Sequence, residues 1–450
     1  AATQLFTPDW IVRYMVENSL GRLWIEGHPN DELKGQWKYY LEEAEQEPEV
    51  QAQLDAIREE YKALKPEDIQ CIDPCSGSGH ILAYMFDVLV QIYEAYGVDT
   101  RTAVTSIVEN NLYGLDIDDR AAQLSYFAVM MKACQYDKRF LKRRDENGNP
   151  KIPQPKVFPI LESGCVDKAG NTRFKFDKNV LDYFSNGDEH LREAIDTIIK
   201  ELFNAKEYGS ILTVTPQDWS VLYDRFAEIT EDINMSRETA LRELLPLVQV
   251  AEVLAQKYDA YITNPPYLGN KSMSNNIASY LKNNFDGLKM DLFAVFVKKG
   301  FEMTTKHGVM GFMTPFVWMF ISSFSELRST IIENGSITSL VQLEYSGFDG
   351  ATVPICTYTL AKVPANIAGE YIKLSDFRGV DKQPLKTLEA VSNNSCGYRY
   401  SVKTNIFKLF PENVIAYWAS HNFVHLFEQC KRLDDIYPCK KGMTTGDNNK

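Results

Sequence analysis

The sequence predicts an α/β fold with a doubly wound, mostly parallel sheet and helical insertions. A short apolar strand at residues 70–73 runs into a glycine-rich turn at residues 73–80, and an apolar helix follows over residues 81–96. A second strand at residues 111–117 ends in acids and leads into another helix, which extends to about residue 135. This succession of strand, glycine loop, helix and acidic strand end is typical of nucleotide-binding sheets.

The other elements follow from apolar periodicity and from helix and turn signals. We expect them in this order: a helix at residues 8–24, a charged helix or helical pair at 38–64, a third strand at 157–161, a helical insertion at 175–252, a fourth strand at 257–263, a helix at 292–304, a strand at 308–314, a helix at 324–334, and a closing β-hairpin at 339–345 and 354–361. After about residue 366 the pattern becomes irregular.

The composition of the 450-residue chain limits its class. A hydrophobic content of 44% can fill a sizeable core, and no segment is long and apolar enough to predict a membrane span. The eight cysteines form no Cys-x-x-Cys pair, which predicts reduced thiols and no metal site. The net charge of −13 argues against a surface that wraps nucleic acid, but it allows a local basic cleft. We expect a cytoplasmic protein.

The glycine-rich turn Asp-Pro-Cys-Ser-Gly-Ser-Gly-His occupies residues 73–80. Gly77 and Gly79 allow the backbone to turn tightly and to approach a ligand, whose charged groups can meet the start of the next helix. The spacing matches neither the three-glycine dinucleotide motif nor the phosphate-binding loop. Taken alone, an ordinary tight turn explains the pattern equally well.

Two further motifs stand at predicted strand ends. Asp116 is placed to accept hydrogen bonds from the ribose hydroxyls of a nucleoside, while Asp118 or Asp119 is the better candidate to cap the next helix. Asn-Pro-Pro-Tyr at residues 264–267 follows the fourth strand. Its two prolines fix the direction of the preceding carbonyl and amide, and would project them into the crevice where ligands bind.

Together with Thr7-Pro8 and Phe348, these motifs resemble the DNA amino-methyltransferases that act on adenine, in their gamma order. Residues 3–12 and 441–448 more closely resemble the PglX methyltransferases of BREX phage defence, a family related to the fused restriction–modification enzymes. The resemblance covers nearly the whole chain. It implies a sheet of the S-adenosylmethionine-dependent methyltransferase type, a catalytic domain at residues 1–365 with excursions at about 31–66 and 175–252, and a linker with the truncated start of a target-recognition domain at 366–450.

The resemblance also implies a cofactor, partners and residue roles. The cofactor would be S-adenosyl-L-methionine, and its pocket would be lined by Thr7, Pro8, Asp73, Pro74, Gly77, Gly79, Asp116, Ile117 and Glu162. The partners would be double-stranded DNA and other phage-defence proteins, with no membrane involved. The motif Asn264, Pro265, Pro266 and Tyr267 would be catalytic.

In this resemblance, the side-chain oxygen of Asn264 and the carbonyl of Pro265 accept the two protons of the exocyclic amine of a flipped-out adenine. Tyr267 stacks on one face of that base. Phe348 would close the other face, although packing in the core explains an aromatic side chain there as well.

Two other functions fit the same motifs. Asn-Pro-Pro-Tyr also serves to orient planar nitrogens in methyltransferases that act on protein or RNA. A catalytically silent DNA-binding scaffold could retain this fold, although the intact motif argues against decay. Cofactor-binding calorimetry followed by a methyl-transfer assay would separate the scaffold from an enzyme.

Overall fold

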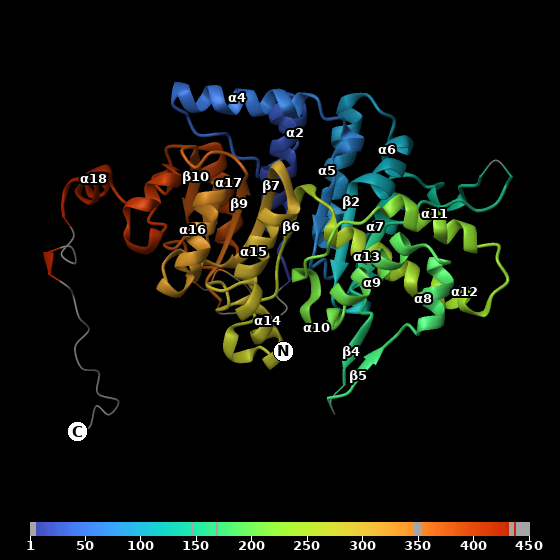
Figure 1. Ribbon diagram of the computed structural model, residues 1–450. Helices are drawn as coiled ribbons and strands as arrows, with labels where there is room; N and C mark the ends of the chain where they lie inside the picture. The colour runs from blue at the N-terminus through green and yellow to red at the C-terminus, as the bar shows by residue number, and fades with distance from the viewer. Residues whose placement is uncertain are drawn as a thin grey trace.

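The computed structural model describes residues 6–145, 147–167, 170–345, 347, 353–431 and 436–437. Its described residues form a nine-stranded sheet in the order β11-β10-β8-β9-β7-β6-β1-β2-β3 (Figure 1). Its strands are β1 (Cys71–Asp73), β2 (Leu112–Asp116), β3 (Lys156–Pro159), β6 (Tyr258–Thr263), β7 (Thr304–Pro315), β8 (Ser336–Gln342), β9 (Ile355–Ala361), β10 (Ala368–Lys373) and β11 (Arg399–Lys403). A separate hairpin joins β4 (Gly164–Val166) to β5 (Thr172–Phe174).

The predicted fold class is confirmed by the strand pairing. Strands β3, β2, β1, β6 and β7 run parallel to their neighbours, as β8 and β10 do, whereas β9 is antiparallel to β7 and β8, and β11 is antiparallel to β10. The chain leaves β1 toward β2 on one side and later returns as β6 on the other side. In an open parallel sheet, such a point of reversal opens a crevice at the carboxyl ends of the two strands.

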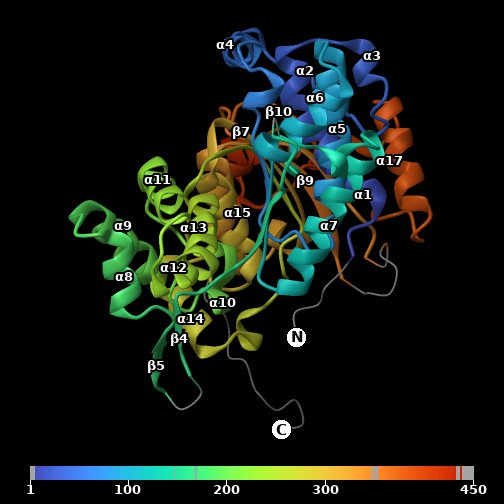
Figure 2. The same ribbon diagram turned by 90° about the vertical axis from the view of Figure 1, so that its right-hand side faces the viewer.

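Helices cover both faces of the sheet. In Figure 2, α5, α6, α7 and α17 lie on one side of the strands, and α13 and α15 lie on the other. The helices are α1 (Asp9–Val16), α2 (Arg22–Gly27), α3 (Asp31–Lys34), α4 (Pro48–Lys62), α5 (His80–Tyr96), α6 (Thr100–Ser106), α7 (Asp119–Tyr136), α8 (Lys178–Ser185), α9 (Glu189–Glu201), α10 (Ala205–Tyr208), α11 (Trp219–Ile229), α12 (Met235–Thr239), α13 (Leu245–Ala255), α14 (Asn275–Asn284), α15 (Leu292–Met303), α16 (Ser325–Asn334), α17 (Lys382–Ser392) and α18 (His421–Gln429).

The core has two layers, one on each side of the sheet. Neighbouring side chains of a strand enter different layers: Tyr261 packs with the α13 and α15 side, and Ile262 with the α1 and α5 side. Every residue of β9 is buried. A strand in the middle of such a sheet is covered on both faces, and β9 keeps Thr357 and Thr359 buried among its apolar residues. Among the described helices, none has the length and apolarity that crossing a membrane requires.

The predicted helix at residues 8–24 is interrupted by a π-helical turn at Glu17–Gly21. Asn18, on this turn, donates its amide to the carbonyl of Tyr39 at 2.7 Å and accepts from the backbone N–H of Leu41 at 2.8 Å. The carboxylate of Glu17 accepts from the N–H of Tyr39 at 2.6 Å and from the hydroxyl of Tyr84 at 2.6 Å. The turn therefore places two polar side chains inside the protein, where they satisfy an irregular backbone.

The prediction of helix from residue 38 was wrong for residues 38–47, where the structure has no helix. Here side chains replace the helical hydrogen bonds. The Gln46 amide pairs in both directions with the backbone of Ala368, at 2.9 Å each, and thereby joins the excursion to β10. From α4, the Tyr61 hydroxyl donates to the carbonyl of His307, on β7, at 2.6 Å. The excursion braces the sheet rather than standing apart in solvent.

The sheet also continues past residue 365, where we placed the end of the catalytic domain. Strand β10 pairs with β8, and β11 pairs with β10. The insertion at residues 175–252 is helical as predicted and contains α8 to α13. The domain division itself stays a prediction.

Burial raises the pKa of Glu17 to about 7, against hydrogen bonds from Tyr84 and Tyr39 that lower it; its ordinary value is 4.5. A carboxyl whose folded-state pKa is raised stabilises the fold fully below its ordinary pKa, and this contribution is lost as the pH rises through about 7. We therefore expect the free energy of unfolding to fall by about 1–3 kcal/mol more for the native chain than for Glu17→Gln between pH 5 and 8.

Urea denaturation across this range measures the difference. Glutamine can accept from Tyr39 and donate to the Tyr84 oxygen, so the variant keeps both contacts. The carboxyl of Asp73, whose pKa is also raised, is present in both proteins, so its contribution to the pH dependence of stability is the same in both. Parallel pH profiles for the two proteins would contradict the prediction.

Candidate cofactor and substrate site

The predicted site residues gather where β1 and β6 end side by side. The two strands pair directly, with Cys71 opposite Ala260 and Ile72 opposite Tyr261. Just beyond this pairing, the Thr263 hydroxyl donates to the carboxylate of Asp73 at 2.8 Å. The glycine loop that leaves β1 and the Asn-Pro-Pro-Tyr segment that leaves β6 are therefore held together at their first residues.

The glycine loop is fastened to the end of β2. The N–H of Ser76 donates to the carbonyl of Leu115 at 2.9 Å, and the N–H of Gly77 donates to the Asp116 carboxylate at 2.8 Å. Gly79 precedes α5 with φ +82°, and a Cβ there would lie 2.9 Å from the Cα of Ser125 on α7. A tight approach of the loop to α7 requires glycine at this position.

The two acids that we assigned to different roles do occupy different positions. Asp118 caps α7, because it accepts from the N–H groups of Arg120 and Ala121 at 2.7 and 3.2 Å. These bonds lower the pKa of Asp118, that from Ala121 first. Asp116 instead accepts from Gly77 and, at 2.9 Å, from the N–H of Asp118. Burial raises the pKa of Asp116, and these backbone donors partly offset the rise.

Asp73 is almost fully buried, with only 1% of its surface exposed. Its Oδ1 atom accepts from Thr263 and from the N–H of Cys75 at 3.1 Å. Within the described part of the chain, its Oδ2 atom is buried without a hydrogen-bond partner, as is the hydroxyl of Ser76. Burial raises the pKa of Asp73 to about 7, although the bonds from Thr263 and Cys75 lower it and Asp116 raises it further.

Asn264 stands at the centre of a chain of polar contacts. Its amide donates to the Thr7 hydroxyl at 3.0 Å, and its side-chain oxygen accepts from the Tyr267 hydroxyl at 2.9 Å. The Tyr267 hydroxyl also lies 3.0 Å from the carbonyl of Met313 on β7, and its ring meets Phe293 edge-on. The structure thus brings Thr7 against the Asn-Pro-Pro-Tyr segment, across 257 positions of sequence.

The remaining predicted residues lie at the same edge or outside the described chain. Pro74 accepts a hydrogen bond from Ser210, Ile117 is exposed beside Gly209, and Glu162 is partly exposed just beyond β3. Pro8 precedes α1, Pro265 is buried, and Pro266 is partly buried. Phe348, residues 3–5 and residues 441–448 lie outside the described residues.

Sequence reasoning missed three residues that support the loop. The Ser210 hydroxyl donates to the carbonyl of Pro74 at 2.6 Å, and Lys206 donates to the carbonyl of Ile117 at 3.1 Å. Thr263 supplies the bond to Asp73. No local pattern marks these side chains, because their partners lie far away in sequence.

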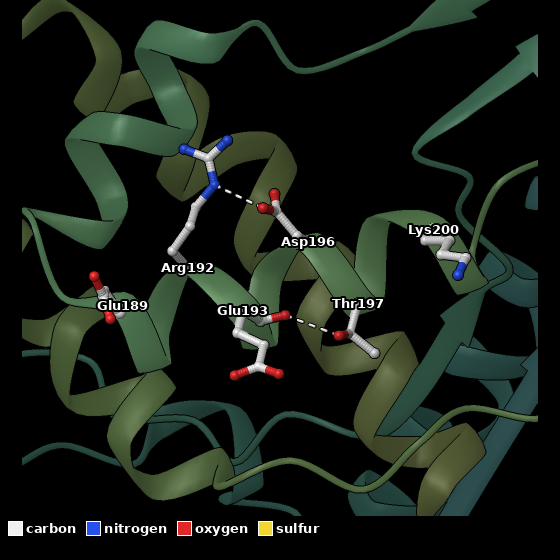
Figure 3. A pocket seen from close by; sticks show the side chains of 6 residues that line it. All are labelled: Glu189, Arg192, Glu193, Asp196, Thr197 and Lys200. Carbon is white, nitrogen blue, oxygen red and sulfur yellow. Dashed lines mark hydrogen bonds and ion pairs between the residues drawn. The ribbon is translucent and has the colours of Figure 1, made fainter.

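A surface hollow of about 430 Å³ lies elsewhere, along the outer side of α9 (Figure 3). It is lined by Glu189, Arg192, Glu193, Asp196, Thr197 and Lys200, which share no member with the strand-end site. Arg192 is paired with Asp196 at 2.8 Å across one turn of the same helix. Since the hollow is open along one helix face and shares no residue with the strand-end site, we assign it no part in the chemistry.

Comparison with known proteins agrees with this arrangement. Residues 110–348 match the family model described as Eco57I restriction-modification methylase, which covers more than half of the chain. The chain belongs to this family. The matched range includes Asp116 and the whole Asn-Pro-Pro-Tyr motif, so it contains the acid at the end of β2 and the segment that follows β6.

Two relatives extend the match beyond these limits. The chain is 36% identical over 435 residues to the adenine-specific methyltransferase BrxX of Escherichia coli O9:H4 (strain HS), covering 95% of this chain and 36% of that protein. It is 34% identical over 466 residues to the adenine-specific methyltransferase PglX of Lacticaseibacillus casei (strain Zhang), covering 100% and 37%. The predicted resemblance to PglX is confirmed, and the chain spans little more than a third of the length of these relatives.

Among solved structures, the DrdV–DNA complex determined by cryo-electron microscopy matches with a TM-score of 0.48 at 11% identity, over 93% of this chain and 31% of that one.

Gly79 provides a test of how tightly the loop is built. We expect Gly79→Ala to lower the free energy of unfolding by about 2–4 kcal/mol, because it adds a clash with α7 to the cost of a left-handed backbone. Gly97→Ala is the matched control: it ends the same helix with φ +94°, and a Cβ there would meet nothing within 4 Å. Its expected cost is about 1–2 kcal/mol. Equal losses in urea denaturation would show that α7 yields to the added methyl group.

Proposed function

We propose that this chain is the catalytic part of a site-specific DNA methyltransferase, which transfers a methyl group from S-adenosylmethionine to the N6 amine of a flipped-out adenine. The observation that carries the proposal is the Asn264 amide, held by Thr7 and Tyr267 beside the glycine loop. Family membership and the names of the relatives support it, and they favour a role in phage defence or restriction–modification.

The residues at the strand ends fit the proposed cofactor. The unpartnered Oδ2 of Asp73 and hydroxyl of Ser76 offer buried acceptors for a charged, hydrogen-bonding ligand. Asp116 already accepts from two backbone N–H groups, but a carboxylate has capacity for further donors, such as ribose hydroxyls. Ile117 and Glu162 lie at the rim, where the adenine of the cofactor would sit. When bound, S-adenosylmethionine supplies an electrophilic methyl group.

On the substrate side, Asn264 and Pro265 would orient the amine. Each of its two N–H groups would donate to one oxygen, the amide oxygen of Asn264 or the carbonyl of Pro265. The nitrogen lone pair would then face the methyl carbon. As the new nitrogen–carbon bond formed, the bond from that carbon to the cofactor sulfur would break, S-adenosylhomocysteine would be the leaving group, and the nitrogen would release one proton to water. Such a displacement depends on alignment more than on a strong base.

The target base must leave the duplex to reach this site, because the amine is otherwise paired and stacked. Tyr267 would stack on one face of the base, and Phe348 would close the other. We propose double-stranded DNA as the substrate and other phage-defence proteins as partners. The reader of the recognised sequence would lie mainly outside this chain, which spans about a third of the relatives.

Replacing Asn264 tests the chemistry. Asn264→Ala should reduce methyl transfer to adenine by about a hundredfold or more, because the amine loses an acceptor that aligns it. Cofactor affinity should stay within about threefold, since this side chain would touch the base. Single-turnover assays with the intact protein, with products resolved by mass, measure the effect. Methylcytosine as the product would overturn the substrate assignment, and an ordinary rate in the variant would overturn the mechanism.

Replacing Asp116 tests the cofactor pocket. Asp116→Ala should weaken S-adenosylmethionine binding by about 2–3 kcal/mol, because it removes both the ribose acceptor and the brace on Gly77. Asp118→Ala is the control: losing the cap of α7 should lower stability modestly and leave affinity nearly unchanged. Titration calorimetry compares the two variants. A larger loss of affinity in Asp118→Ala would reverse the assignment.

A further inference from the structure

The segment that follows the Asn-Pro-Pro-Tyr motif is mostly exposed. It forms a 3-10 turn at Asn270–Ser272 and then α14, which ends at Asn284, before the chain enters α15. In both ribbon views α14 lies beside α10 at the lower edge of the molecule (Figures 1 and 2). We call residues 270–284 the polar segment, because most of its side chains are exposed asparagines, serines and lysines.

The polar segment lies within a stretch that has no acidic residue. Asp and Glu make up 61 of the 450 residues, yet none occurs at residues 260–285. Lys271 and Lys282 are both exposed, and within the described part of the chain neither forms an ion pair. Asp286, the next acid along the chain, is paired with Lys289 at 2.7 Å. The segment is therefore locally positive on a chain whose net charge is −13.

One face of α14 is turned to solvent along its length. Leu281 is buried, whereas Asn275, Ser279 and Lys282 share the opposite face and are exposed. A helix of 10 residues is about 15 Å long, which corresponds to about four base pairs of duplex DNA. Lysine, asparagine and serine side chains all donate hydrogen bonds to phosphate oxygens. This face therefore has the length and the donors for a contact with a DNA backbone.

Glu207, on α10, contacts the polar segment, but its carboxylate is already engaged. It accepts from the Ser274 hydroxyl at 2.5 Å and from the Asn276 amide at 2.8 Å. These bonds direct the carboxylate to the start of α14, whereas Lys282 lies on the last turn. The acid therefore fixes the start of the helix and leaves the charge of Lys282 unpaired.

The residues on either side of Glu207 connect α14 with the end of β2. Tyr208 stacks on Tyr280 of α14 with ring centroids 4.5 Å apart, and Lys206 donates to the carbonyl of Ile117 at 3.1 Å. Consecutive residues of α10 thus hold the polar segment in a fixed position relative to the glycine loop and Asp116. A ligand would meet a surface that is already ordered, and this lowers the entropic cost of binding.

We propose that the polar segment binds the phosphate backbone of double-stranded DNA beside the target adenine, with Lys271 and Lys282 as its charged contacts. The segment begins three residues after Tyr267, so a backbone held there would lie next to the base that enters the site. Phosphates respond to the nearby field rather than to the total charge of the protein. Such contacts fix the register of the duplex without reading its sequence. This inference rests on the proposed function and assigns its DNA substrate a surface.

Paired substitutions separate local charge from total charge. Lys271→Gln combined with Lys282→Gln removes both charges at similar side-chain length, and Lys271→Arg combined with Lys282→Arg keeps them. Lys38→Gln combined with Lys65→Gln is the matched control, since these lysines are also exposed and flank α4, which lies at the upper edge in both ribbon views (Figures 1 and 2). Both glutamine pairs change the net charge equally. Urea denaturation verifies that each variant is folded.

The intact protein is titrated with two labelled duplexes, one that contains its modified site and one that does not, at several salt concentrations. Fluorescence anisotropy gives the Kd. We expect the glutamine pair in the polar segment to weaken binding to both duplexes by about five- to thirtyfold at low salt. The slope of log Kd against log salt should fall by about 2, because two phosphate contacts are lost. The arginine pair and the control pair should stay within about twofold of the native protein.

Two further measurements separate DNA binding from the chemistry of the site. In the glutamine pair of the polar segment, calorimetry should give the native affinity for S-adenosylmethionine without DNA. Single-turnover methylation at saturating DNA should stay within about threefold of the native rate, because the lysines would hold the backbone rather than the reacting amine.

Four results would overturn the inference. They are unchanged affinity and salt slope in the glutamine pair of the polar segment, an equal loss in the control pair, an equal loss in the arginine pair, and a loss confined to the duplex with the modified site. The first would leave the segment without a DNA contact, the second would make total charge decisive, the third would exclude charge as the cause, and the fourth would make the segment a reader of sequence. A native protein that neither binds duplex DNA nor methylates adenine would overturn the proposed function instead.

Discussion

The site depends on one contact, the hydrogen bond between Thr263 and Asp73 at the point where the sheet reverses its order. Strands β1 and β6 are neighbours in the sheet although 190 residues separate these two side chains. Their loops diverge immediately beyond the bond, because one leads to α5 and the other toward α14. The divergence of the loops is therefore a consequence of topology, and the bond sets how far apart they begin.

The second constraint is electrostatic. Asp73 and Asp116 are both withdrawn from water in this crevice, and each carboxyl has its pKa raised mainly by burial. Backbone N–H groups of the glycine loop and the Thr263 hydroxyl offset only part of the cost of burying the two carboxylates. A ligand that carries positive charge would lower both pKa values again, since an opposite charge nearby favours the ionised carboxyl. The site thus suits a cationic ligand even though the whole chain has a net charge of −13.

The elements that could be predicted from the sequence are those that a local sequence pattern determines. The helix at α5 and the strand at β2 were located to within about one residue of their observed bounds, because apolar periodicity and a glycine loop mark them. The glycine loop, Asp116 and Asn264 were located because strand ends face one crevice. Strands β10 and β11 were missed, since their short and mixed residues carry no such pattern. Neither the π-helical turn at Glu17 nor the contact of Thr7 with Asn264 has a local signal, because both depend on partners brought in by the fold.

The helical insertion, whose purpose the sequence left open, has a physical role at the edge of the sheet where the glycine loop and Asp116 lie. Its residues 206–210 lie against both loops of that edge: Ser210 bonds the backbone of the glycine loop, and Lys206 bonds the backbone that follows Asp116. Lys206 also pairs with Asp119 at the start of α7. These contacts fix carbonyl groups that the turns would otherwise leave to solvent. The insertion therefore supports the glycine loop and the end of β2 from one side while α5 and α7 hold them from the other, and the geometry at Asp73 and Asp116 depends on both.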